Sequence, residues 1–155
     1  MTKLIIQIPC RNEEATLGPT LKALPRTLPG VNIVECLIID DGSSDQTIQV
    51  ARAHGVDHVV TLPRHQGLAK AFVAGLEASL KAGADISKTG TFSGSRLVLA
   101  EIELGEKTYE INRKIAERTR TEADKYSTKE KRRWVAGSIG PTTKPISVTG
   151  GITFE

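Results

Sequence analysis

The segment 37–45 constrains this chain most, because an aliphatic run in it stops abruptly at two carboxylates. Asp40 and Asp41 end the run, a glycine and two serines come next, and Asp45 opens a helical pattern. This order predicts a buried parallel strand, a tight polar turn and a helix N-terminus. Open α/β sheets bind ligands beyond the carboxyl ends of their strands, so both aspartates are candidates to accept hydrogen bonds from a ribose or a base. We expect Asp41 to lie in an exposed turn, and Asp45 or the serine before it to cap the helix.

Strand and helix patterns alternate along the whole chain. Short apolar runs predict five strands, at 4–8, 34–39, 57–62, 85–92 and 134–137. Apolar residues at helical spacing predict helices over 13–24, 45–54, 68–81 and 96–126, the last of them broken near Gly105. Residues 146–149 and 152–155 are expected to form a small hairpin or a frayed end. The alternation predicts a three-layer Rossmann-like α/β sandwich with a five-stranded parallel sheet in the order 3-2-1-4-5.

The composition argues against several kinds of partner and cofactor. The net charge of the 155 residues is only +3, with both signs mixed, which does not favour nucleic acid. No apolar run is long enough to span a bilayer and no targeting segment is seen, so we expect a cytoplasmic location. Cys10 and Cys36 are expected to be reduced and buried. No metal or other cofactor is indicated, and we expect a monomer or a weak homodimer formed through an edge strand.

Three motifs in residues 4–85 follow one another in a recognisable order. They read IPCRNEE at 8–14, IIDDGSSD at 38–45 and RHQGLAKAF at 64–72. Together they resemble the N-terminal half of a family 2 glycosyltransferase with the GT-A fold. The resemblance implies that the first loop and Asp41 contact the nucleotide of a sugar donor, and that the 64–70 loop lies near its diphosphate. With the aspartate turn, this makes the candidate nucleotide-binding residues Pro9, Asn12, Glu13, Asp40, Asp41, Arg64 and Lys70.

The chain departs from that family where the metal should bind. The family resemblance implies a strand that ends in a DxD-type acidic motif, which holds a divalent metal on the donor phosphates. The corresponding segment, Ala84–Gly90, has no such acidic cluster. No match to the acceptor half or its catalytic base is found, the three histidines are scattered, and no nucleophile stands beside a base. We therefore predict no metal site and no catalytic residue.

The segment 83–143 resembles a different family. TGTFSGSRLVLAE at 89–101, YEIN at 109–112 and VAGSIGPTT at 135–143 are similar to the homocysteine-binding (β/α)8 domain of cobalamin-dependent methionine synthase. In that family the position of Gly90 is usually asparagine. The zinc-binding cysteines of the family lie far beyond this segment and nothing here replaces them, so zinc and thiol activation are not carried over.

The two resemblances meet at 82–86, where both families have a helix end, a glycine and a strand start. We interpret residues 1–84 and 85–155 as two parts of one α/β domain, joined by engineering or recombination; a truncated or misassembled reading frame is the alternative. We expect no catalysis and at most weak nucleotide or phosphate binding. The predicted strand order opens a crevice between the loops after strands one and four, where Ser93, Gly94 and Ser95 would hold an anion. A nucleotide-sugar-dependent family 2 glycosyltransferase fragment is the alternative function.

Overall fold

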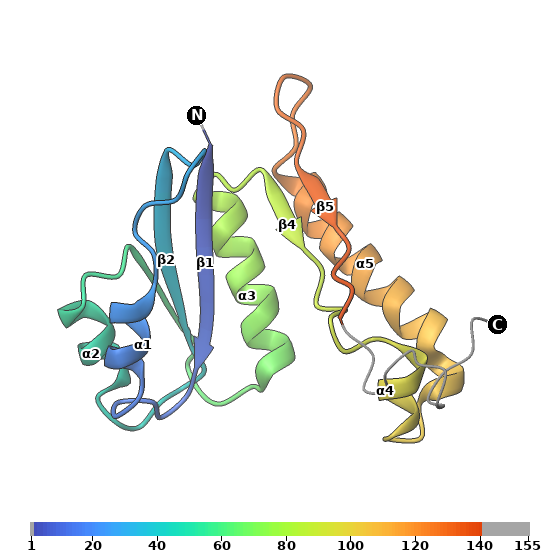
Figure 1. Ribbon diagram of the computed structural model, residues 1–155, viewed down its shortest axis with the longest axis horizontal. Helices are drawn as coiled ribbons and strands as arrows, with labels where there is room; N and C mark the ends of the chain where they lie inside the picture. Colours follow the sequence, from blue (N-terminus) through green and yellow to red (C-terminus); the bar gives the residue numbers. More distant parts are fainter. Residues whose placement is uncertain (1, 141–155) are drawn as a thin grey trace, which may run out of the picture. The chain divides into compact units, whose positions relative to one another are not determined.

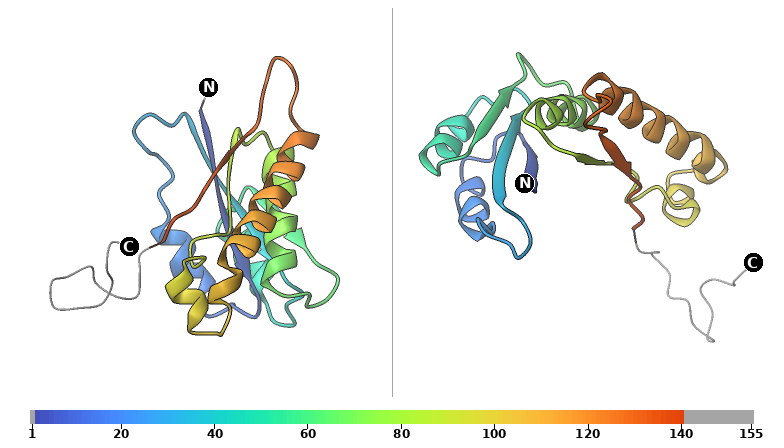
Figure 2. Two further views of the ribbon diagram at one scale, coloured as in Figure 1. Left: turned by 90° about the vertical axis from the view of Figure 1, so that its right-hand side faces the viewer. Right: turned by 90° about the horizontal axis from the view of Figure 1, so that it is seen from above.

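A computed structural model of the chain describes residues 2–140 (Figures 1 and 2). The chain divides into two compact units, Met1–Asp85 and Ile86–Glu155, and each is described by itself. The elements predicted at 146–149 and 152–155 lie outside the described residues. Among residues 2–140, no helix combines the length and the apolar character that crossing a membrane requires.

The first unit is a three-stranded parallel sheet with helices on both faces. Its strands are β1 (Lys3–Cys10), β2 (Ile33–Asp40) and β3 (His58–Thr61), with β2 in the centre. Asp40 is in register with Cys10 on one side and Thr61 on the other, so the three carboxyl ends lie side by side. The loops that follow these strands therefore share one edge of the sheet, which is where open sheets bind ligands.

Alternation along β2 creates a core on each face of this sheet. Cys36 and Ile38 pack with residues of α1 (Leu17–Ala23) and α2 (Thr47–Ala53), while Leu37 and Ile39 pack with residues of α3 (Leu68–Lys81). These helices cover the two faces of the sheet (Figure 2). Successive strand residues point to opposite faces, so a continuous apolar run is what a strand buried on both sides requires. The last five residues of β2 are all buried. The three-layer arrangement expected from the sequence is thus found in this unit.

Helix α3 lies unusually close to the sheet at Gly75. A Cβ at this position would lie 2.6 Å from the Gln7 Oε1 atom and 2.8 Å from the Ile39 Cδ1 atom. Neither side chain moves away freely, because the Gln7 Nε2 donates to the Ser79 hydroxyl at 3.0 Å and Ile39 is buried. The small residue therefore sets the distance between helix and sheet.

We expect the variant Gly75→Ala to lower the free energy of unfolding by about 1 to 2 kcal/mol, because overpacking outweighs the gain in helix propensity. Urea unfolding measures the change. The control is Ala69→Gly at an exposed position of α3, which should cost about 1 kcal/mol from helix propensity alone. A stabilised Gly75→Ala protein would mean that α3 does not pack this closely.

The second unit contains a pair of short parallel strands and two helices. β4 (Ile86–Lys88) pairs with β5 (Trp134–Ala136), and between them come α4 (Arg96–Ala100), the 3-10 turn η1 (Gly105–Lys107) and the long α5 (Thr108–Lys125) (Figure 1). The break predicted near Gly105 is therefore present. Ion pairs at i,i+4 spacing, such as Glu110–Lys114 at 2.6 Å, line the exposed side of α5.

The sheet order predicted from the sequence is wrong. The α/β class with parallel strands is confirmed, but the strands form one sheet of three and another of two instead of a single sheet ordered 3-2-1-4-5. Within residues 2–140 the missing step is the pairing of β1 with β4. A central strand is buried on both faces, whereas β4 is only three residues long and exposes Ile86 and Lys88.

Candidate functional site

A pocket of about 250 Å³ lies at the carboxyl ends of β1 and β2 in the first unit. We call it the strand-end pocket. It is formed by the end of β1, the loops after β1, β2 and β3, and the first turn of α3. Its lining residues are Pro9, Cys10, Arg11, Glu13, Asp41, His65, Leu68 and Ala71. The place agrees with the edge where the sequence predicted a ligand.

Asp41 is buried in the wall of this pocket, so the expectation of an exposed turn is wrong. Only 5% of the residue is exposed. One carboxylate oxygen accepts a hydrogen bond from the Gln66 amide at 2.7 Å. The other accepts from the Gly67 amide at 2.9 Å and contacts the His65 Nδ1 atom at 2.7 Å. Asp41 therefore holds the loop before α3 in place.

These contacts also set the charge of Asp41 and the direction of the His65 ring. Burial alone would raise the pKa of Asp41, but the hydrogen bonds from Gln66, Gly67 and His65 hold it below its usual value. Because the His65 Nδ1 atom is held by the carboxylate, Nε2 is the ring nitrogen left for a ligand. His65 lines the pocket with a side chain that is 52% exposed.

The loops after β1 and β2 are joined by reciprocal hydrogen bonds. The Asn12 amide donates to the Ser43 hydroxyl at 2.9 Å, and the Ser44 amide donates to the Asn12 side-chain oxygen at 2.9 Å. Asn12 adopts a left-handed φ of 55°, which asparagine tolerates better than most residues. Asp40 is buried and accepts from the Ser43 amide at 3.2 Å. Asn12 and Asp40 thus use much of their hydrogen-bonding capacity within the protein.

The start of α2 differs slightly from the prediction. The residue before the helix is Gln46, and its side chain makes no capping hydrogen bond. Asp45 nevertheless accepts from the Thr47 amide at 3.0 Å and from the Glu14 amide at 3.1 Å. Neither Asp45 nor Ser44 is therefore the N-cap residue, although Asp45 still satisfies one of the free amides of the first turn.

Some of the predicted site residues come together and others do not. Pro9, Glu13 and Asp41 line the strand-end pocket, and the other predicted residues do not. The exposed Arg64 and Lys70 lie outside its lining. Sequence reasoning missed two lining residues that carry cationic or titratable groups, Arg11 and His65. Each lies within a motif quoted for the glycosyltransferase resemblance, which is the signal that points to them.

Cys10 also lines the pocket, but its thiol is not activated as a nucleophile. Burial, together with the carboxylates of Asp40 and Glu13, raises the pKa of the Cys10 thiol to about 12. A thiol nucleophile acts as a thiolate, and at neutral pH this group stays protonated. Cys10 and Cys36 are both buried and free, in agreement with the sequence.

The predicted anion residues lie in the second unit. The Ser95 hydroxyl accepts from the Val98 amide at 3.3 Å and so caps α4. The Gly94 amide donates to the Thr91 carbonyl at 2.9 Å, so it is occupied. The crevice expected beside Ser93 depended on β1 and β4 being neighbours. That reasoning no longer holds, because the two strands belong to separate sheets.

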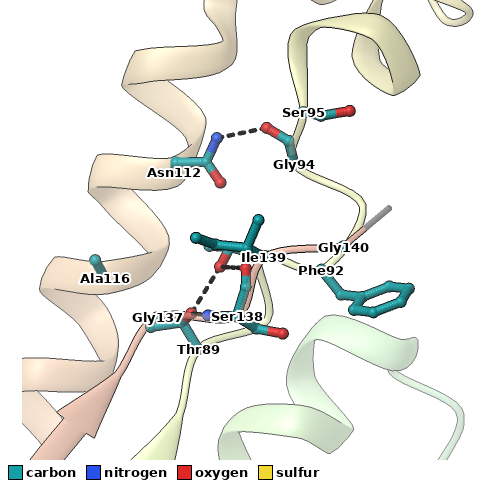
Figure 3. Close-up of a pocket in the computed structure, with 11 residues that line it drawn as sticks. Thr89, Phe92, Gly94, Ser95, Asn112, Ala116, Gly137, Ser138, Ile139 and Gly140 are labelled. Carbon is teal, nitrogen blue, oxygen red and sulfur yellow. Dashed lines mark hydrogen bonds between the residues drawn. The ribbon is translucent and has the colours of Figure 1, made fainter. Parts of the chain in front are cut away.

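A second pocket, of about 320 Å³, lies within this unit at the carboxyl ends of β4 and β5 (Figure 3). We call it the loop pocket. It is lined by parts of the loop 89–95, by the α5 residues Asn112 and Ala116, and by residues 137–140. Thr89 ties the two strand ends together, since its hydroxyl accepts from the Ser138 amide at 3.0 Å and contacts the Thr91 hydroxyl at 2.7 Å.

Comparison with known proteins identifies the family. The family model for homocysteine S-methyltransferase matches residues 39–155, about three quarters of the chain. The chain belongs to the homocysteine S-methyltransferase family. The match begins within β2, so it is longer than the resemblance found over 83–143 in the sequence.

Solved structures are also similar to this chain. A mycobacterial protein has 23% identity over 67% of this chain, with a TM-score of 0.38, and this chain spans about half (48%) of its length. Glucosyl-3-phosphoglycerate synthase from Mycobacterium tuberculosis, solved with Mn2+, uridine diphosphate and glucosyl-3-phosphoglycerate, has 18% identity over 90% of this chain and 70% of its own, with a TM-score of 0.42. Another structure of the M. tuberculosis synthase has 18% identity over 94% of this chain and 74% of its own, with a TM-score of 0.38. The segment 83–143, for which the sequence suggested the methionine synthase resemblance, lies within the residues 39–155 that the family model matches.

The metal sites that the two resemblances imply do not fit the residues described. Within residues 2–140 of this homocysteine S-methyltransferase family member, no group of three or more histidine, cysteine, aspartate or glutamate side chains converges on one point. Zinc needs such a set of ligands, and a donor-phosphate metal needs clustered carboxylates. At the DxD-type position, Asp85 is followed by Ile86, Ser87 and Lys88. The described residues therefore do not form a metal site of either kind.

Proposed function

We propose that this chain is a recombined α/β protein that binds a nucleotide or free phosphate weakly at the strand-end pocket and does not turn over a sugar donor. The single observation that carries the proposal is the pocket itself, at the strand edge where α/β sheets take ligands. Arg11 brings a permanent positive charge to its lining, and the Nε2 of His65 adds a further polar contact. The Arg11 guanidinium donates to the oxygens of a phosphate. With the ring proton on Nδ1 donated to Asp41, Nε2 of His65 is an acceptor and suits a ribose hydroxyl.

The hydrogen bonds within the unit explain why the binding should be weak. Asp41, Asp40 and Asn12 are engaged by neighbouring loops, so few groups remain for a ribose or base. Glu13 lines the same pocket and would repel a phosphate. We expect a dissociation constant on the order of 0.1 to 1 mM, which corresponds to about 4 to 5.5 kcal/mol.

The organisation of the chain supports an origin by recombination. The boundary between the two compact units follows Asp85, within the segment 82–86 where the two sequence resemblances meet. Gly83 has a φ of 105° and ends α3 just before this boundary. A helix end followed by a strand start is a point where two α/β proteins can be joined without breaking an element. We propose that the two parts that meet at 82–86 derive from different ancestors, with the homocysteine S-methyltransferase match extending across this boundary back to residue 39.

The experiment is a titration of the protein with uridine diphosphate and guanosine diphosphate, with and without Mn2+, followed by amide chemical shifts. Shifts should concentrate at Arg11, Glu13 and His65. The variant Arg11→Gln should weaken binding about fivefold or more, because a charge-assisted hydrogen bond is lost. The control Arg52→Gln, in the last turn of α2 and outside the pocket lining, should leave the affinity unchanged.

Manganese separates this proposal from the glycosyltransferase alternative. With no clustered carboxylates on the described residues, Mn2+ should not tighten nucleotide binding. A tenfold gain in affinity with Mn2+ would favour a nucleotide-sugar-dependent glycosyltransferase fragment. An absence of shifts at millimolar nucleotide would sink the binding proposal altogether.

A further inference from the structure

The loop pocket of the second unit has a size and lining that suit a small molecule. Its volume of about 320 Å³ is at the lower end of the range for ligand sites, and an apolar cavity half that size is enough to hold a single aromatic ring. The lining consists of glycine, alanine, serine, threonine, asparagine, phenylalanine and isoleucine residues. None of these side chains is ionisable, so a charged ligand would lose its water without gaining a partner of opposite charge.

Most polar groups of the lining are occupied by one another. The Thr91 hydroxyl donates to the Ser138 carbonyl at 2.7 Å, and the Thr89 hydroxyl accepts from the Ser138 amide at 3.0 Å. The two threonine hydroxyls also contact each other at 2.7 Å. Because these groups are already paired, they tie β4 and β5 together and offer little to a ligand.

Asn112 differs from these groups. Its amide nitrogen donates to the Gly94 carbonyl at 2.7 Å and to the Thr108 carbonyl at 2.9 Å, which uses both of its protons. These bonds fix the orientation of the amide group. No donor from residues 2–140 reaches the side-chain oxygen, and Figure 3 shows this oxygen on the side of Ile139. The pocket therefore has one positioned acceptor in a largely apolar lining.

We propose that the loop pocket binds a small, uncharged and largely apolar molecule that carries one hydroxyl or N–H group, which donates to the Asn112 side-chain oxygen. The apolar part of the ligand lies against Ala116 and Ile139, which also line the pocket. The site is separate from the strand-end pocket, so it does not depend on the proposed nucleotide binding.

The test uses the full chain and three one-ring probes of similar size, observed by amide chemical shifts. Phenol has the required hydroxyl, toluene lacks it, and benzoate carries a charge. We expect phenol to bind with a dissociation constant on the order of 1 mM and to shift Gly94, Asn112 and Ser138. Toluene should bind about fivefold more weakly because it leaves the Asn112 oxygen without a donor, and benzoate should not bind.

Filling the pocket provides the second part of the test. A Cβ on Gly137 would meet nothing within 4 Å, so the variant Gly137→Val places a side chain there without a clash. Ala116→Leu fills the pocket from α5 and gives an independent check if the first variant folds poorly. The control Thr121→Val changes an exposed residue of α5 outside the lining.

Phenol binding should be lost in both filled variants and kept in the control. Three results would overturn the proposal: no shifts with phenol, equal affinity for phenol and toluene, or phenol binding that persists in the filled variants.

Discussion

Replacing Gly42 by alanine should lower the free energy of unfolding of the first unit by about 2 to 4 kcal/mol. Gly42 has a φ of 70°, which L-residues with a side chain rarely adopt. A Cβ at this position would lie 2.5 Å from the Arg64 carbonyl carbon and 2.6 Å from the His65 amide nitrogen. Both are backbone atoms, so neither can turn away as the end of a flexible side chain would. The free-energy costs of the backbone strain and of the steric clash therefore add.

Gly55 is a matched control for Gly42. Its φ of 67° is nearly the same, but a Cβ there would meet nothing within 4 Å. The variant Gly55→Ala should therefore cost only about 1 kcal/mol, from the left-handed conformation alone. Urea unfolding followed through the amide signals of β2 measures both variants on the same unit. Equal losses in the two variants would show that the loops after β2 and β3 do not touch as described.

The helix and strand pattern of the first unit could be predicted because its signals are local. Helix α3 spans Leu68–Lys81, as expected from apolar residues four apart and from glycines at its two ends. Gly67 and Gly83 both have positive φ values, which explains why glycine stands at each boundary. The strands β1, β2 and β3 follow from short aliphatic runs, and the central β2 has the longest buried run, its last five residues.

The sheet order could not be predicted in the same way, because it depends on pairing between distant segments. The neighbours β1–β2, β2–β3 and β4–β5 were predicted correctly, and the β1–β4 pairing was not. Ser87, Lys88 and Gly90 already interrupt the run at 85–92 in the sequence. A strand of three residues offers few hydrogen bonds and little apolar area, so it is a poor centre for a sheet.

The burial of side chains at the candidate site could not be predicted from the sequence either, because it also depends on contacts between distant segments. A carboxylate just after a strand is expected to face water, and Asp41 was predicted to do so. Its burial depends on the loop at 64–67, more than twenty residues further along the chain, which folds over it. His65 and Arg11 were missed for a related reason, since their place in the pocket depends on the packing of three loops.

We therefore expect Asp41 to contribute strongly to the stability of the first unit. The variant Asp41→Asn keeps the shape of the side chain but turns one acceptor oxygen into a donor that faces N–H groups. We expect the midpoint of thermal unfolding to fall by about 10 °C, because a buried charged acceptor with three partners is lost. The control His65→Ala removes one partner and leaves the Gln66 and Gly67 amides bonded to the carboxylate. It should lower the midpoint by less than half as much.

The pH dependence of the stability difference between the original protein and Asp41→Asn gives a second and independent measure of the role of Asp41. The folded-state pKa of Asp41 is lowered by its hydrogen bonds, while an aspartate in the unfolded chain has a pKa of about 3.9. The stability due to the charged form is therefore fully present above about pH 5 and is lost as the pH falls below 4 toward the folded-state pKa. The gap between the original protein and Asp41→Asn should be constant from about pH 5 to 7 and should narrow below about pH 4. A gap that stays constant down to pH 3, or a midpoint unchanged by the substitution, would mean that Asp41 is exposed after all and free to contact a ligand.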